Sequence, residues 1–567
     1  MQPPSDAPYW SFDGRPPTLR TMSDSTSSTA SSDSSPRAPV NLSRHYNRTT
    51  LARKGNPMKS FYKYFTIPGI TNLAGGLPYS GYFPFDTLES DAASANRFLQ
   101  SLHNAPTPTP AASSKSFSLF SRSNNHLTIP KSESNLPLDQ RIDVDTTLQY
   151  GRASGLASLA EFVKDFTLNH LHQGKIPYAD ADTLLTCGST DGMNKVVSLI
   201  ASNGDNMLCE EFAYNPALNA ARPHGVGVVV VDMDKHGLLV DGPNGLREIL
   251  ETWDEDTMGR KPHFLYTVSI GHNPTGSTTE LPRMREIYTL CQQHDILIIE
   301  DNPYWYLQFT TSSHKSPDNF LASLTPSYLT LDADGRVIRL DTFSKTIAPG
   351  CRLGWITAQS DVITRLIALT DASTQAPSGF VQAHLAHLLI RHWGMSGWIT
   401  WLSTLRAAYE SRMRTMTTIL HDNAHYISSA AQRSTVHVSK IKMLEFRPPA
   451  GGMFVWVRIK IRNHPVYKAF RRAGWSREEM VRKLWLYVAM RKLVLVAPGE
   501  MFRPDETVDA VEYWRLCFAA VEEGEVERAT RRLCEGVEEF WGLGVGEIEA
   551  ITEDGVEGMV GGGEGRV

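Results

Sequence analysis

Short apolar runs alternate with stretches of helical periodicity between residues 183 and 340. The predicted strands are Thr183–Cys187, Val226–Asp232, Phe264–Val268, Asp295–Ile299 and Val337–Leu340. The predicted helices between them include Asp191–Ser202 and Leu281–His294. Such alternation predicts an α/β fold with a mostly parallel sheet covered by helices on both faces. Because ligands of these sheets bind at the carboxyl ends of the strands, we expect the functional site at that edge.

The pattern changes near residue 395, where strands and helices no longer alternate regularly. This part predicts a smaller α+β domain over residues 395–547, next to a large domain over residues 146–394. We assign residues 51–102 to the small domain as its N-terminal segment. The elements predicted in residues 395–547 are helix Trp398–Ser428, strands Met443–Phe446 and Met453–Ile459, helix Arg477–Met490, strands Leu493–Ala497 and Arg515–Ala519, and helix Glu525–Trp541.

Three segments have a composition that does not predict a packed core. Residues 1–50 are rich in Ser, Thr, Pro and Asp without hydrophobic periodicity, so we predict a disordered tail. Residues 103–145 have a similar composition and predict a low-complexity surface insert. Residues 548–567 are rich in Gly and Glu and predict a flexible tail.

Composition excludes several classes of protein. The formal charge of -5 and the lack of a basic block argue against nucleic-acid binding, and no apolar run is long enough to span a membrane. The six cysteines form no CxxC pair, so neither a disulfide framework nor a metal site is predicted. The N-terminus lacks the apolar core of a secretory signal, and acidic residues offset its arginines. We expect a cytosolic protein; the serine-rich N-terminus leaves a mitochondrial transit peptide as the alternative.

The run Asp341–Trp355 carries the strongest chemical signal. Lys345 has hydroxyl groups beside it at Thr342 and Ser344, and Arg352 follows a Pro-Gly break. A lysine amine can form a Schiff base with an aldehyde, while hydroxyls and a guanidinium hold a phosphate. A phosphate-bearing aldehyde such as pyridoxal phosphate suits this run, although a loop lysine can also be merely a solvated charge.

Other candidate residues follow predicted strands. Gly188–Gly192 opens a helix, so Ser189 and Thr190 can help to bind an anion at its N-terminus; an ordinary helix cap is the alternative. Asp301 ends an apolar strand and can pair with a protonated pyridine nitrogen, or serve simply as a turn residue. Tyr304 comes three residues later and can reach the phenolic oxygen of the same ring.

Three more residues suit the same ligand and its substrate. Asn273, in the turn Gly271–Gly276, can donate a hydrogen bond to the phenolic oxygen, and its bond to the following proline can be cis. Tyr214 can stack on the ring, although a core aromatic is the alternative. Arg515 starts an apolar strand and suits bidentate binding of an α-carboxylate, unless it is an ordinary edge-strand arginine.

Taken together in this order, the motifs resemble those of the class I/II aminotransferases, which have PLP-transferase fold type I. Within this class the chain is similar to fungal aromatic aminotransferases and to 2-aminoadipate/kynurenine aminotransferases. The runs that carry this likeness are Lys63–Pro78, Tyr82–Phe85, Leu148–Gly151, Gly271–Gly276 and Val496–Gly499. The resemblance covers residues 50–102 and 146–540 and implies a large domain with a sheet of seven strands and a smaller α+β domain.

The resemblance implies a role for each candidate residue. Lys345 attaches pyridoxal phosphate and moves the proton, Asp301 pairs with the ring nitrogen, and Arg515 binds the substrate carboxylate. Gly76 lies near the substrate, and Tyr150 reaches the cofactor of a partner subunit, which implies a homodimer with shared active sites. The remaining cofactor-binding residues are Ser189, Thr190, Tyr214, Asn273, Tyr304, Thr342, Ser344 and Arg352.

The chain departs from the family pattern at a few places. Thr342 stands where many relatives have serine, which keeps the hydroxyl. Glu500 follows Pro498-Gly499 where a neutral residue is expected, which makes it a candidate for altering side-chain preference. The insert at residues 103–145 is not a core feature of the family and ends close to Tyr150, so we expect it near the dimer interface.

The implied reaction is transamination between an aromatic or 2-aminoadipate-like amino acid and a 2-oxo acid, with 2-oxoglutarate as the expected acceptor. A ping-pong cycle is implied, in which Lys345 acts as general base on the Cα proton. Other reactions share the lysine motif, so a pyridoxal-phosphate lyase or synthase and an aminotransferase of secondary metabolism stay open. A ligand-sensing transcription regulator is the remaining alternative, but residues 1–50 show no DNA-binding helical pattern.

Overall fold

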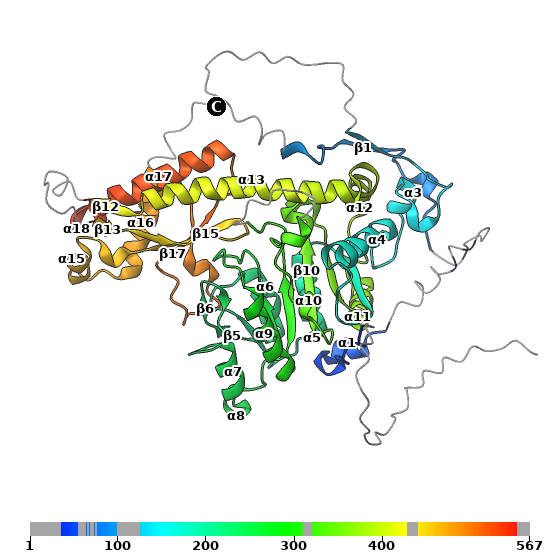
Figure 1. Ribbon diagram of the computed structural model, residues 1–567, viewed down its shortest axis with the longest axis horizontal. Helices are drawn as coiled ribbons and strands as arrows, with labels where there is room; N and C mark the ends of the chain where they lie inside the picture. The colour runs from blue at the N-terminus through cyan, green and yellow to red at the C-terminus, as the bar shows by residue number, and fades with distance from the viewer. Residues whose placement is uncertain are drawn as a thin grey trace, which may run out of the picture. The chain divides into compact units, whose positions relative to one another are not determined.

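The computed structural model describes residues 36–54, 64, 67, 73, 76–98, 125–309, 320–427 and 440–552. Its central element is a seven-stranded sheet with the order β3-β11-β10-β9-β8-β4-β5 (Figure 1). All neighbours pair in parallel except β11, which is antiparallel to both β3 and β10. The predicted mostly parallel sheet is therefore confirmed. Its strands are β3 Ala181–Thr186, β4 Asn206–Glu210, β5 Gly227–Val231, β8 Phe264–Thr267, β9 Leu297–Asp301, β10 Val337–Thr342 and β11 Gly354–Gln359.

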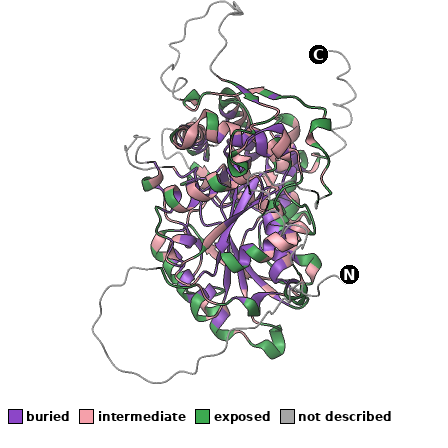
Figure 2. Ribbon diagram, turned by 90° about the vertical axis from the view of Figure 1, so that its right-hand side faces the viewer, coloured by how far each residue is buried: buried purple, intermediate pink, exposed green. Residues whose placement is uncertain are grey.

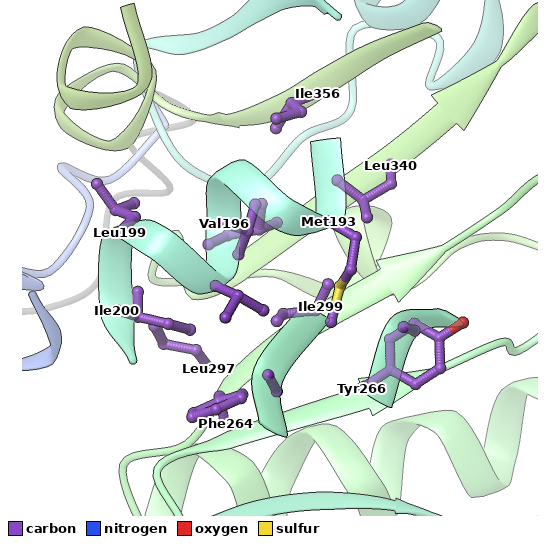
Figure 3. Packing of buried hydrophobic residues seen from close by; sticks show 14 of the residues in the cluster. Met193, Val196, Leu199, Ile200, Phe264, Tyr266, Leu297, Ile299, Leu340 and Ile356 are labelled. Carbon is purple, nitrogen blue, oxygen red and sulfur yellow. The ribbon is translucent and has the colours of Figure 1, made fainter. Parts of the chain in front are cut away.

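Helices cover both faces of this sheet, so its central strands are buried throughout (Figure 2). Helix α5 (Ser189–Ile200) places Met193, Val196, Val197 and Ile200 at the i, i+3, i+4, i+7 spacing of a single apolar face. Figure 3 shows this face against Phe264, Tyr266, Leu297, Ile299 and Leu340 of the sheet. Helix α9 (Leu281–Gln293) contributes Met284, Ile287 and Leu290 to the cluster on Leu265 and Ile298.

A second sheet lies in the C-terminal part, with four antiparallel strands in the order β14-β15-β17-β16. Its strands are β14 Leu444–Phe446, β15 Phe454–Ile459, β16 Ala497–Pro498 and β17 Tyr513–Cys517. Helices α16 (Arg477–Arg491) and α17 (Glu523–Trp541) pack on it through a shared apolar cluster. The predicted strand Leu493–Ala497 is wrong over most of its length, because only Ala497 pairs and Leu493 has a φ of 53° that a strand does not allow.

Helix α13 (Gly394–Asp422) has 29 residues and joins the two sheets (Figure 1). Its N-terminal half places Trp398 and Leu402 in the cluster with Trp355. Its C-terminal half places Met416 and Leu420 in the cluster of the four-stranded sheet. The predicted domain boundary at residue 395 therefore coincides with the start of a helix that both parts share.

The predicted disorder of residues 1–50 is wrong for residues 36–50, whereas residues 1–35 lie outside the described part. Leu42 and Tyr46 are buried, and Asn47 caps the short helix α1 (Arg48–Ala52). The Asn47 side chain also donates to the carbonyls of Ser198 and Ala201 at the end of α5. Without any periodicity of its own, the segment is ordered by burial against a surface that the rest of the chain forms.

The predicted insert is likewise too long, because residues 125–145 are ordered and residues 103–124 lie outside the described part. Strand β2 (His126–Ile129) pairs with β1 (Leu88–Asp91), and Ile129, Ile142 and Val144 are buried. The predicted flexible tail is wrong for residues 548–552, since Ile548 of α18 (Val545–Glu549) is buried. Residues 553–567 lie outside the described part.

The remaining helices and strands are short, except α11, which has 12 residues. In the part of the chain that the structure describes, no helix is both long and apolar enough to span a membrane, and no cluster of metal-ligating side chains is found. The remaining elements are α3 Val144–Thr147, α4 Ala157–Asp165, α6 Asn215–Ala221, α7 Leu246–Thr252, α8 Glu255–Met258, α10 Tyr328–Leu331, α11 Ser360–Asp371, α12 Gly379–Ala386, α15 Tyr467–Arg472, β6 Met233–Asp234, β7 Gly237–Leu238, β12 His425–Ile427 and β13 Lys440–Lys442.

Candidate active site

Lys345 lies just beyond the carboxyl end of β10, in the single turn Phe343–Lys345. The turn is held by Thr342, whose hydroxyl oxygen accepts a hydrogen bond from the Ser344 N–H at 3.1 Å. Burial lowers the pKa of Lys345, and the nearby cations Arg515 and Arg352 lower it further, while Cys517 and Asp301 act in the opposite direction. A half-buried lysine with a lowered pKa supplies the neutral amine that a nucleophile or a base needs.

A group of hydroxyls, an arginine and a helix N-terminus gathers next to this lysine. The Arg352 guanidinium donates to the Ser344 hydroxyl and to the Cys187 carbonyl, each at 3.2 Å. Gly188 separates Cys187 from the first turn of α5, and with a φ of 90° it leaves the space that Arg352 occupies. Because Ser189 and Thr190 stand at that helix N-terminus, backbone N–H groups, hydroxyls and a cation meet as in an anion site.

Asp301 ends β9 one strand away from the lysine loop. Its Oδ2 accepts a hydrogen bond from the Tyr266 hydroxyl at 3.0 Å, whereas its Oδ1 is buried without a hydrogen-bond partner. Burial raises the pKa of Asp301 to about 7, against the opposite effects of Tyr266 and Lys345. A buried carboxylate oxygen without a partner is costly unless a ligand supplies a donor.

Arg515 comes from the four-stranded sheet and reaches the loop after β8. Its Nη1 donates to the Asn273 side-chain oxygen at 2.8 Å. The guanidinium lies over the rings of Phe454 and Phe502, at 4.2 and 4.6 Å from their centroids. Its Nε is buried without a partner. The aromatic rings fix the plane of the guanidinium, which leaves a donor available for an anionic ligand.

Two tyrosines complete the cluster. Tyr214 caps helix α6 and is half-buried, and burial raises its pKa. Tyr304 is buried with its ring edge-to-face on Phe454 at 5.6 Å, and burial raises its pKa as well. Burial and the charge of Asp301 raise the pKa of both phenols and Arg515 opposes the rise, so both stay protonated beside the lysine.

Two predicted residues stand apart from this cluster. Tyr150 is 58% exposed and lines a cavity of 710 Å³ together with Phe85, Arg152 and Phe380. Among the residues that the structure describes, none of the clustered side chains lines that cavity. Gly76 is exposed with open space around its Cα, and the run Lys63–Pro78 is described only in part. Tyr150 therefore lies on a cavity that the clustered side chains do not line, and Gly76 is open to solvent.

Sequence reasoning missed Tyr266, the hydrogen-bond donor to Asp301. The signal was present, because the strand Phe264–Thr267 reads as buried on both faces, and a buried tyrosine usually needs a partner for its hydroxyl. Glu500, the predicted departure from the family pattern, is exposed in the turn that follows β16.

Comparison with known proteins identifies this arrangement. Residues 123–533 match the family model described as aminotransferase class I and II. The chain belongs to this family. The predicted resemblance, fold class and enzyme class are thereby confirmed, and pyridoxal phosphate is the cofactor that the family implies.

Several known proteins are similar to this aminotransferase over most of its length. An aromatic amino acid aminotransferase of Schizosaccharomyces pombe is 32% identical over 508 residues, which cover 87% of this chain and 97% of the relative. An L-tyrosine:2-oxoglutarate aminotransferase of Serpula lacrymans is 33% identical and covers 77% of this chain and 78% of its own length. The crystal structure of an aminotransferase from Candida albicans matches with a TM-score of 0.72 and 31% identity, over 89% of this chain and 100% of the other.

The residues of this site provide a partner for each reactive or charged group of pyridoxal phosphate. The protonated ring nitrogen needs an anionic acceptor, and the buried Oδ1 of Asp301 accepts no hydrogen bond from the described chain. The phosphate needs donors, and Arg352, Ser344 and the N-terminus of α5 converge on one place. The aldehyde needs an amine, and Lys345, whose pKa is lowered, lies close enough to Arg352 and Asp301 to be affected by both charges.

Proposed function

We propose that this aminotransferase acts on aromatic or 2-aminoadipate-like amino acids and transfers their amino group to 2-oxoglutarate. The names of relatives support this choice of substrates, since they include aromatic, L-tyrosine:2-oxoglutarate and kynurenine/alpha-aminoadipate aminotransferases. One observation supports this choice of site above all. Asp301 has a buried oxygen without a hydrogen-bond partner, and its carboxylate lies close enough to Lys345 for the two charges to interact. The proposal assigns Asp301, Lys345 and Tyr214 as catalytic residues.

Different residues would bind the phosphate, the ring nitrogen, the ring face and the phenolic oxygen of the cofactor. Ser189, Thr190, Thr342, Ser344 and Arg352 bind or surround the phosphate, and Asp301 pairs with the ring nitrogen. Tyr214 stacks on the ring, while Asn273 and Tyr304 bind its phenolic oxygen. When bound, pyridoxal phosphate supplies an aldehyde that condenses with amines and a ring that takes up the electron pair released at Cα.

Lys345 has a double role in this proposal. It would tether the cofactor, and its Nζ, once free, would take the proton from the substrate Cα and deliver it to the carbon of the cofactor's former aldehyde. A base must be neutral before it accepts a proton, and burial together with Arg515 and Arg352 favours the neutral amine. Asp301 would keep the ring nitrogen protonated, which makes the ring a better acceptor of the electron pair.

Arg515 would bind the substrate α-carboxylate. Its guanidinium is already oriented by Asn273 and by the rings of Phe454 and Phe502, so little conformational entropy is lost on binding. Asn273 thus contacts both the cofactor and the group that binds the substrate. We place Gly76 near the substrate as well, on the segment that precedes β1.

We further propose a homodimer with shared active sites. Tyr150 and Phe380 are large exposed residues beside a 710 Å³ cavity, and Tyr79, Tyr82 and Phe85 are exposed in the segment that lines it in part. Covering these apolar side chains by a second copy would bring Tyr150 towards the cofactor of the partner subunit. Sedimentation of the purified protein tests this: a monomer at micromolar concentration would contradict it.

We also propose that the enzyme works in the cytosol. All six cysteines are free, which suits a reducing compartment. Cell fractionation with the full-length chain tests the compartment, and enrichment in mitochondria would contradict the proposal.

The decisive experiment combines a variant with a panel of amino donors. Lys345→Ala should abolish transamination and the visible absorption band of the lysine-bound cofactor, while Lys164→Ala, at a surface ion pair, should leave both unchanged. In the wild-type enzyme, tyrosine, phenylalanine, kynurenine and 2-aminoadipate are each offered with 2-oxoglutarate. Turnover with none of these donors, or normal turnover in Lys345→Ala, would contradict the proposal.

A further inference from the structure

Tyr266 lies in β8, next to the strand that ends in Asp301. Its ring is fully buried between the sheet and α5, where it packs among the apolar side chains of Figure 3. Its hydroxyl donates to Asp301 Oδ2 at 3.0 Å. Burial, together with Asp301 and Glu210, raises the pKa of Tyr266 well above its ordinary value, so the hydroxyl stays protonated and remains a donor.

This hydrogen bond makes the two oxygens of Asp301 unequal. Oδ2 is occupied by Tyr266, whereas Oδ1 is buried and lacks a partner within the described chain. A carboxylate without such a bond could rotate about its Cβ–Cγ bond and present either oxygen or neither. The packed ring of Tyr266 cannot follow such a rotation, because the residues around it are close-packed.

We propose that Tyr266 is a positioning residue for the reaction: it holds the Asp301 carboxylate so that Oδ1 points to the place of the cofactor's ring nitrogen. This inference rests on the proposed function, in which Asp301 is the partner of that nitrogen. It assigns Tyr266 no contact with the cofactor, because its hydroxyl acts on the far oxygen of the carboxylate.

The same bond favours the charged form of Asp301. Burial raises the pKa of this carboxyl to about 7, and the Tyr266 hydroxyl opposes that rise. An ionised partner keeps a proton on the ring nitrogen, which makes the ring a better acceptor of electrons. The other titratable groups that face Asp301 are Lys345, Asp341, Glu210, Tyr214 and Tyr304.

The test titrates the full-length protein with pyridoxal phosphate and follows the absorbance of bound cofactor as a function of pH. Tyr266→Phe removes only the hydroxyl, so binding should weaken about tenfold, the scale of one hydrogen bond to a charged group. The pH at which binding is half-maximal should move to higher pH, because Asp301 without its donor ionises less readily. In turnover assays kcat should fall more than KM rises, because Arg515 still binds the substrate.

Tyr306→Phe is the matched control, because its hydroxyl also donates to a buried aspartate, Asp341, at 3.4 Å. It should leave the affinity for the cofactor and its pH dependence unchanged. Incorporating 3-fluorotyrosine at position 266 keeps the packing and strengthens the donor, so it should move the half-maximal pH lower. This second measurement decides the matter if Tyr266→Phe does not fold.

The outcomes separate this inference from the proposed function. Wild-type affinity and pH dependence in Tyr266→Phe, or an equal change in Tyr306→Phe, would overturn the positioning role alone, provided that Asp301→Asn loses affinity. Wild-type affinity in Asp301→Asn would overturn the assignment of Asp301 itself, and the role of Tyr266 with it. Loss of affinity in Asp301→Asn and in Tyr266→Phe, but not in Tyr306→Phe, is the expected result.

Discussion

Strands β9 and β10 lie side by side, and each carries a buried aspartate at its carboxyl end. Asp341 is bound by Arg339 through Nε and Nη2, at 2.7 and 2.9 Å, and Tyr306 is a further donor. Asp301 has a single protein donor, Tyr266, and one oxygen with no partner. Both side chains are buried to a similar depth, at 0% and 7% exposure.

The two carboxylates differ in whether both of their oxygens accept hydrogen bonds from the protein. Asp341 points to the same face of the sheet as Arg339, two residues earlier, so its charge is neutralised within one strand. The charge of Asp301 is not neutralised in this way, and that makes it available to a cationic ligand. A buried carboxylate therefore indicates a binding site only when its hydrogen-bond partners have been counted.

The largest effect should come from removing the charge of Asp301. We expect Asp301→Asn to lower kcat by at least about a thousandfold, because the ring nitrogen loses the carboxylate that keeps it protonated and the ring becomes a poorer electron acceptor. Steady-state kinetics at saturating pyridoxal phosphate measure this. Activity within tenfold of wild type would show that the unpaired oxygen has no catalytic role.

Breaking the pair at Asp341 should act on stability instead. Asp341→Leu leaves the buried Arg339 without its counter-ion, and we expect a loss of about 3–5 kcal/mol in the free energy of unfolding. The double variant Arg339→Met/Asp341→Leu should recover most of it, because neither charge of the pair remains buried without the other. Urea unfolding of both variants measures the effect; equal losses would contradict the pairing argument.

The pH dependence of stability should distinguish Asp301 from its neighbours. Its pKa is raised from 3.8 to about 7 in the folded protein, so the charged form is disfavoured on folding. The cofactor-free wild type should therefore lose about 2–3 kcal/mol relative to Asp301→Asn between pH 5 and pH 8. Asp332 also has a pKa of about 7 but is not affected by Asp301, so its titration cancels in the difference. The charge of Asp301 raises the pKa of Glu210, so Glu210→Gln should be present in both proteins that are compared. A pH-independent difference would contradict the raised pKa.

The smallest effect should come from Tyr306→Phe. Asp341 keeps both hydrogen bonds from Arg339, so losing the long 3.4 Å bond should cost about 1 kcal/mol or less of stability. Thermal or urea unfolding of the cofactor-bound enzyme measures it. A loss as large as that of Asp341→Leu would mean that the arginine alone does not satisfy this carboxylate.

Much of the fold could be predicted from local patterns. The strands that become β3, β8, β9 and β10 are apolar runs of the right length, and α5 shows its buried face in the spacing of Met193 to Ile200. Order in residues 36–50 and 125–145 could not be predicted, because it depends on surfaces from other parts of the chain. Leu42 and Ile129 are buried only after those surfaces exist.

By itself, the sequence determined the family, the Lys345 loop and the positions along the chain of Ser189, Asn273 and Asp301, each close after a predicted strand. These features follow from residue type and spacing along the chain. Only the tertiary structure decided which buried aspartate is free, that Tyr266 holds it, and that Phe454 and Phe502 orient Arg515. The physical reason is that hydrogen-bond satisfaction and burial depend on neighbours from other strands, and the local sequence does not contain them.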